Sequence, residues 1–272
     1  MIELFAVYQY AFLLCLVAGV LLSFLGAHLV TRKESLQVLA LAQAALVGNL
    51  VGRLAFSEKL QEIGVLVFSL IFFIIFKLLF IYSKRIMRSS KETFFVVTYL
   101  SLISISYLLI SIFPGLEGHM AVSFFGDIVS LPVERSIVIT IILFVLLIIM
   151  LLMRRRLLRG SFEKAVLGSK KIELSEELLF ALIFVISLYS FGFLFTVSTI
   201  IFPTVLIGSK GRSLGQIITI MLIVTGVSSM LGLGGSIWLE RLSTVPTQVL
   251  TLLVFLVVIG LVLQTQRNKR SD

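Results

Sequence analysis

Long apolar runs alternate with short polar loops along nearly the whole chain. A helix needs about 20 apolar residues to cross roughly 30 Å of hydrocarbon. Seven clear runs have that length: residues 5–30, 61–82, 93–113, 135–153, 177–200, 214–232 and 246–263. An eighth and weaker run, residues 36–56, has Gln37, Gln43 and Asn49 within a background of alanine, leucine, valine and glycine. The pattern predicts an all-α fold, a polytopic transmembrane helix bundle of about eight spans.

The composition agrees with a membrane protein. The mean hydropathy is +1.14, and charged residues make up 14% of the chain, whereas soluble domains carry roughly a quarter. The longest polar connection, around residues 154–176, is too short for a folded extramembrane domain. The run 5–30 lacks a preceding basic segment and is longer than the apolar part of a typical signal peptide, so we expect a retained helix. We therefore predict one transmembrane domain over residues 1–272.

Basic residues account for the net charge of +9 and also predict the topology. They cluster in two loops, residues 84–91 and 154–171. The positive-inside rule places both loops in the cytoplasm, which puts the N-terminus and the loop at residues 58–62 outside. The charge thus has a membrane explanation, and we expect no nucleic-acid partner.

The segment 177–208 is too long for one straight span, because each helical residue adds only 1.5 Å. It contains Gly192, a stretch rich in serine and threonine, and Pro203. We expect a full helix followed by a short, broken half-helix near Pro203 that returns the chain to the cytoplasm. The later basic residues and the C-terminus then lie inside as well.

Several kinds of chemistry are missing from the sequence. Cys15 is the single cysteine, which excludes internal disulfides and cysteine-rich metal sites, so we expect it to pack. No aspartate or glutamate lies inside the predicted spans, away from their ends, which disfavours a proton-coupled carrier. Lys77, near the basic end of its span, is expected to extend to the interface. No phosphate-binding loop occurs, so we expect no ATP or other cofactor on this chain and no enzymatic activity of its own.

Four passages carry a resemblance to a known family. Residues 40–48 read Ala-Leu-Ala-Gln-Ala-Ala-Leu-Val-Gly, and residues 124–128 read Phe-Phe-Gly-Asp-Ile. Residues 162–168 begin Phe-Glu-Lys-Ala and end in glycine, and residues 192–203 run from a glycine to a proline. Their order and separation resemble the permease subunits of the zinc, manganese and iron ABC importers, the ABC-3 type. The resemblance covers almost the whole chain.

The resemblance implies a function and partners. It implies the membrane-spanning permease subunit of an ATP-binding-cassette importer for a divalent metal ion, in the bacterial inner membrane, forming a homodimer with the path on its two-fold axis. The implied partners are a cytoplasmic subunit that binds ATP and an extracytoplasmic substrate-binding protein. It also implies that a short cytoplasmic helix docks on the ATPase; a solvated basic loop is the alternative. The residues of this implied coupling segment are Phe162, Glu163, Ala165 and Gly168.

Small residues in the second span recur at every fourth position, which gives one ridge where another backbone can approach closely. We expect this ridge to pack against a neighbouring helix. Its members are Ala40, Ala44, Gly48 and Gly52.

Three polar residues of the same span are candidates for the substrate path: Gln37, Gln43 and Asn49. A buried amide in a membrane must find a partner or face water, so hydrogen bonds between helices explain the two glutamines equally well. Asp127, on the outer side, either receives substrate or caps the segment that comes after it.

The sequence departs from the family at its metal ligands. The family commonly carries an aspartate and a histidine one turn apart, and Leu39 and Gln43 stand at those positions. His28 and His119 are the remaining histidines, and we expect both at the surface. A dication without an anionic ligand is costly in a low-dielectric path. Either the metal passes largely hydrated or the substrate differs, and the metal-binding residues stay unassigned.

Two other functions are possible. A membrane-embedded hydrolase would need a polar constellation near the interface, for which His119, Ser123 and Asp127 are the candidates. A scaffold without transport activity would keep the fold and lack the site.

Overall fold

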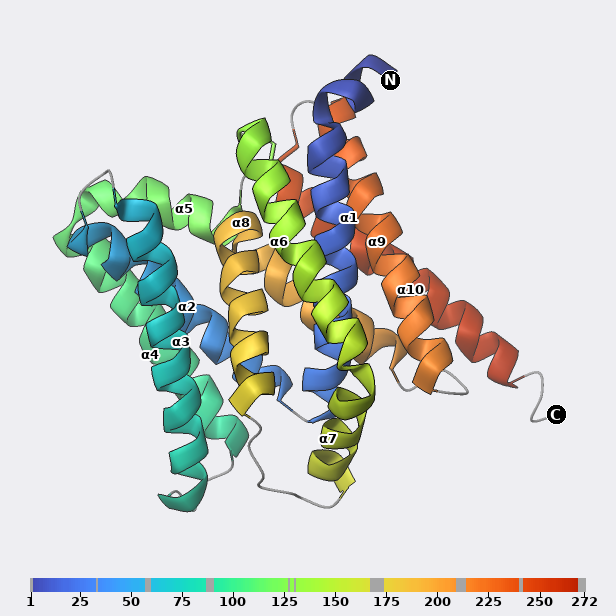
Figure 1. The fold of residues 1–272 in the computed structure, drawn as a ribbon, viewed down its shortest axis with the longest axis horizontal. Helices are drawn as coiled ribbons and strands as arrows, with labels where there is room; N and C mark the ends of the chain where they lie inside the picture. Colours follow the sequence, from blue (N-terminus) through green and yellow to red (C-terminus); the bar gives the residue numbers. More distant parts are fainter. Residues whose placement is uncertain are drawn as a thin grey trace. The chain divides into compact units, whose positions relative to one another are not determined.

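The computed structural model describes residues 2–32, 34–56, 60–86, 91–126, 128–129, 131–166, 174–208, 214–239 and 242–268. The regular secondary structure elements of these residues are all helices (Figure 1). Eight of the helices in this part of the chain are long and apolar enough to cross a membrane, which confirms the predicted polytopic helix bundle. A helix satisfies its backbone hydrogen bonds internally, as a span in lipid must.

The helices form two compact units that alternate along the chain. The first unit consists of residues 1–32, 127–171 and 194–272. It contains α1 (Ile2–Thr31), α6 (Val133–Leu152), α7 (Arg154–Val166), the end of α8 (Leu174–Ile207), α9 (Leu214–Leu239) and α10 (Thr244–Asn268). Helix α1 packs against α6, α7 and α9, and α10 lies along α9 (Figure 1).

Glycines bring the backbones of the first unit close together. A Cβ on Gly26 of α1 would collide with the backbone carbonyl of Ile200 in the second part of α8. A Cβ on Gly19 would lie 2.8 Å from the Ser229 hydroxyl of α9. Helix α1 therefore packs tightly against both helices, as small residues allow between membrane spans. Cys15 of α1 is fully buried and accepts a hydrogen bond from Gln248, so it is a packing residue, as predicted.

The second unit consists of residues 33–126 and 172–193. It contains α2 (Ser35–Ala55), α3 (Gln61–Ile86), α4 (Lys91–Ile112), the 3₁₀ turn η1 (Pro114–Leu116), α5 (Glu117–Phe125) and the start of α8. Helix α2 packs against α3, α4 and α5 (Figure 1). Most of α2 is buried, because its alanines and glycines let neighbouring helices approach closely. Hydropathy did not predict α5, which is too short to be a span.

Helix α8 is broken at Gly192, where φ is 77° and ψ is 175°. The long segment 177–208 was therefore correctly expected to contain two helices. Residues 193–207 form the short second helix, which contains Pro203, and the break precedes that proline by eleven residues. A glycine at this φ and ψ ends the first helix more sharply than the proline would, because almost only glycine occupies that region of backbone space.

Candidate functional site

The three polar residues predicted to line a path are all buried on α2. Gln43 donates from Nε2 to the Ser106 hydroxyl of α4 at 3.1 Å. Asn49 accepts at Oδ1 from Arg53 Nε, also at 3.1 Å, one turn along the same helix. Gln43 therefore joins two helices, one of the two uses expected for it, and Asn49 orients a guanidinium.

Gln37 has no hydrogen-bond partner among the described residues. Its side chain is 1% exposed, and neither amide atom has a donor or acceptor within reach. The Oε1 atom of Gln43 is also buried without a hydrogen-bond partner among the described residues. Leaving one such buried polar atom unsatisfied costs about 1–3 kcal/mol. Two buried amides on the first half of α2 thus retain unused hydrogen-bonding or ligating capacity.

The ridge of small residues on α2 meets other backbones. A Cβ on Gly48 would lie 2.5 Å from the carbonyl oxygen of Phe68, and a Cβ on Gly52 would lie 2.7 Å from that of Gly64, both on α3. Ala44 packs with Leu102 of α4, and Ala40 is fully buried. The ridge lies where α2 contacts two neighbours, which fixes the polar residues of the same helix in place.

The positions of the family's metal ligands hold no anionic group. Leu39 is half-buried and Val38 is buried. Within the described residues, no three histidine, cysteine, aspartate or glutamate side chains lie close enough to hold a metal ion together. The carbonyl oxygens of neutral amides are what the glutamines and the asparagine of this helix offer to a passing cation.

Lys77 corrects one prediction, because its side chain is buried in the protein and its ammonium pairs with two carboxylates. Its Nζ lies 3.3 Å from a carboxylate oxygen of Glu34 and 3.1 Å from one of Glu177, and all three side chains are almost fully buried. This ion cluster joins α3 to the N-terminal ends of α2 and α8. The sequence contains the three charged residues, an isolated lysine in an apolar run and two glutamates at helix starts. It does not indicate that the lysine pairs with these glutamates.

The two histidines differ from each other. The prediction that both lie at the surface is wrong for His28, which is 1% exposed. Its Nδ1 lies 3.1 Å from the Ser161 hydroxyl of α7, and Arg32 Nε donates to the same hydroxyl at 3.1 Å. His119 is half-buried on α5, where burial and then the nearby Arg53 guanidinium lower its pKa.

The residues of the hydrolase alternative do not form a constellation within the described chain. His119 and Ser123 lie one turn apart on α5, and no hydrogen bond joins these two described residues. Asp127 lies outside the described residues. Among the described residues, no base is hydrogen-bonded to the Ser123 hydroxyl, and a serine nucleophile requires such a base.

Helix α7 contains most of the predicted coupling segment. Phe162, Glu163 and Ala165 lie in its last turns, and Gly168 falls outside the described residues. The helix is amphipathic: Leu157 and Ser161 are buried one turn apart, while arginines on its other side are exposed. The family resemblance implied a short helix over residues 162–168, with a solvated basic loop as the alternative; the described part of this segment is helical, and the helix begins at Arg154.

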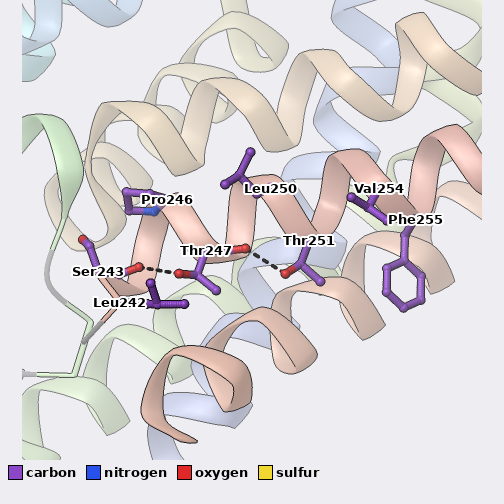
Figure 2. Close-up of a pocket in the computed structure, with 8 residues that line it drawn as sticks. All are labelled: Leu242, Ser243, Pro246, Thr247, Leu250, Thr251, Val254 and Phe255. Carbon is purple, nitrogen blue, oxygen red and sulfur yellow. Dashed lines mark hydrogen bonds between the residues drawn. The ribbon is translucent and has the colours of Figure 1, made fainter. Parts of the chain in front are cut away.

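A groove on α10 offers no chemistry for transport. It has a volume of about 410 Å³, and Figure 2 shows the residues that line it. Its two threonine hydroxyls, on Thr247 and Thr251, donate to carbonyl groups of their own helix. The rest of the lining is mainly apolar, so the groove is suited to hydrocarbon.

The match to a family model decides the family. The model described as the ABC 3 transport family matches residues 5–263. The chain belongs to that family. A comparison with curated proteins gave no match. Among solved structures, this ABC 3 family member is similar to PsaBC from Streptococcus pneumoniae in complex with Fab, with a TM-score of 0.74 and 19% identity over 96% of this chain and 95% of that one.

Membership of this family makes the chain a multi-pass membrane protein and the permease of an ABC importer. At 19% identity the likeness to PsaBC concerns the fold. The resemblance inferred from four short passages is thereby confirmed. Sequence reasoning missed the ion cluster at Lys77 and the hydrogen bonds at Ser161, both of which join residues far apart in the chain.

Proposed function

We propose that this ABC 3 family permease carries a divalent metal ion, zinc, manganese or iron, inward across the bacterial inner membrane. The observation that carries the proposal is the family match over residues 5–263. The helix α7, exposed and basic on one side and succeeded by more basic residues, supports a cytoplasmic contact with an ATPase subunit. That subunit binds and hydrolyses ATP, and an extracytoplasmic binding protein delivers the ion.

The substrate path is proposed to run along the polar residues of α2 in a homodimer. Among the described residues, Gln37 has two buried amide atoms without a hydrogen-bond partner, and Gln43 has one. Neutral amides cannot balance the charge of a dication, so an ion passing here retains part of its water shell, as Mg²⁺ commonly does in proteins. Asn49 is already bonded to Arg53, so it orients the Arg53 guanidinium and does not bind the ion. Asp127 would meet the ion at the outer entrance.

The experiment is reconstitution of the permease in nanodiscs with a tagged candidate ATPase. Copurification of the two subunits is measured first, and ATP hydrolysis is then measured with zinc, manganese, iron and magnesium, with the binding protein present. We expect stimulation by one or more of the first three ions. Gln37→Leu is expected to reduce it, whereas Gln264→Leu, an exposed glutamine of α10, serves as the matched control.

The departure from the family's ligand pair supports a second candidate, a scaffold without transport activity. Leu39 and Gln43 stand where the family has an aspartate and a histidine. Copurification with the ATPase in the absence of stimulation by any ion would favour the scaffold, and failure to copurify would argue against both candidates.

A further inference from the structure

Three buried polar side chains form a chain of hydrogen bonds between α1 and α7 in the first unit. Ser161 of α7 is 2% exposed, His28 of α1 is 1% exposed, and Arg32, at the end of α1, is 7% exposed. The Ser161 hydroxyl lies 3.1 Å from His28 Nδ1 and 3.1 Å from Arg32 Nε. The two partners of Ser161 are separated from it by about 130 residues, so these bonds join two distinct helices.

Ser161 bonds to both partners through one hydroxyl group. A guanidinium only donates, so Ser161 accepts from Arg32 Nε. The tautomer of His28 sets the direction of the second bond, because a hydroxyl can either donate to a bare Nδ1 or accept from a protonated one. In both cases the Ser161 hydroxyl is the group that joins Arg32 to His28, so the relay from Arg32 through Ser161 to His28 requires it.

The position of Ser161 gives the relay its significance. Ser161 directly precedes Phe162 and Glu163, the start of the proposed coupling segment, and lies one turn after the fully buried Leu157. Leu157 and Ser161 thus form the face of α7 that is held in the unit. A force applied to the end of α7 reaches α1 through this face.

Helix α1 can transmit a displacement to its neighbours because it is closely packed against them. Its Gly26 contacts the backbone of Ile200 in the second part of α8, and its Gly19 contacts α9 at Ser229. Close-packed helices transmit small shifts instead of absorbing them. A movement of α7 is therefore felt by two further spans of the same unit.

From this geometry we infer that Ser161, His28 and Arg32 are positioning residues that transmit movement of α7 to α1 during transport. The inference rests on the proposed function, because it assumes that the ATPase acts on α7. The residues touch neither ATP nor the ion. They set how much of the movement reaches the spans.

The test measures ions transported per ATP hydrolysed, in nanodisc or vesicle preparations of the complete complex. Ser161→Ala removes the relay, and Ser161→Thr keeps the hydroxyl. Ser236→Ala is the matched control, because Ser236 is a buried serine of the same unit whose hydroxyl, within the described part of the chain, bonds to the Leu233 carbonyl of its own helix.

We expect Ser161→Ala to lower the ratio of ions to ATP by a factor of about 10, the effect of one buried hydrogen bond of ordinary strength. We expect Ser161→Thr and Ser236→Ala to keep the ratio of the unaltered complex. An unchanged ratio in Ser161→Ala, or an equal loss in Ser236→Ala, would overturn the inference. Loss of ATPase copurification in Ser161→Ala would overturn it too, because the serine would then belong to the docking site.

Two further arms keep the test decisive. Should Ser161→Ala fail to accumulate in the membrane, His28→Phe is measured instead, because it removes the imidazole that bonds to Ser161 and keeps a ring for the edge-to-face contact with Phe24. Should the unaltered permease fail to bind any ATPase, the proposed function fails and the inference with it. If the unaltered complex transports ions and the measured variant has the same ratio of ions to ATP, the inference is overturned and the proposed function stands.

Discussion

Gly126 and Gly192 meet backbone to backbone within the second unit, each with a positive φ. The φ angles are 73° and 77°, and a Cβ on Gly192 would lie 2.5 Å from the backbone nitrogen of Gly126. The neighbouring rings of Phe124 and Phe193 stack with centroids 5.0 Å apart. This contact explains why α8 breaks at Gly192: the end of α5 occupies the space that a continuing side chain would need.

Replacing Gly192 with alanine is expected to destabilise the fold. The substitution adds a strained backbone conformation to a collision with backbone atoms, together about 2–4 kcal/mol. The measurement is the thermal unfolding midpoint of the permease purified in detergent. Gly215→Ala is the control, because a Cβ there meets nothing within 4 Å. An equal midpoint for both variants would contradict the proposed role of the glycine contact.

The ion cluster at Lys77 predicts an asymmetric response to substitution. Lys77→Met removes the ammonium that lies between two buried carboxylates, and breaking a buried ion pair in this way costs about 3–5 kcal/mol. Glu34→Gln is expected to cost less, because Glu177 still pairs with the lysine at 3.1 Å. The thermal unfolding midpoints of Lys77→Met and Glu34→Gln, each measured against the unaltered protein, show which substitution costs more stability.

The triple variant Lys77→Met, Glu34→Gln, Glu177→Gln provides the control for that cluster. It removes all three charges, so most of the stability lost in Lys77→Met should return. A triple variant as unstable as Lys77→Met would mean that the charges left on Glu34 and Glu177 are not what destabilises Lys77→Met.

The spans were predictable from sequence and the polar contacts were not, for a physical reason. A transmembrane span can be recognised from a local stretch of sequence, because about 20 consecutive residues must be mainly apolar. The length of segment 177–208 likewise demanded a break, and Gly192 provides it. Contacts such as Lys77 with Glu177 depend on which helices pack together. A single sequence contains no signal for that pairing.

The same reasoning explains the error at His28. Position in sequence placed it near the end of the first span, where side chains commonly face the interface. The return of the chain as α7 covers it, and Ser161 supplies its hydrogen bond. Burial near a helix end depends on which later helix packs over that end, and hydropathy does not report this.

His119 predicts a pH dependence of stability. Its pKa is lowered from 6.5 by burial and by the Arg53 guanidinium. The folded state therefore opposes protonation: this contribution to stability is fully present above pH 6.5 and is lost as the pH falls below 6.5 towards the folded-state pKa. We expect the unfolding midpoint of the unaltered protein to drop more than that of His119→Gln over this range. Parallel curves for the two proteins would contradict the assignment.

Restoring the family's ligand pair tests how α2 is aligned with the path. Leu39→Asp with Gln43→His places an anionic oxygen and an imidazole nitrogen one turn apart, which is suitable spacing for two ligands of one transition metal. The double variant sacrifices the hydrogen bond from Gln43 to Ser106. We expect it to bind zinc at least about 10-fold more tightly than the unaltered permease in isothermal titration, with each single variant gaining less, because two ligands act together on one ion. Were the double variant to bind no better than Gln43→His alone, residue 39 would not face the path, and the substrate route would have to run along another face of α2.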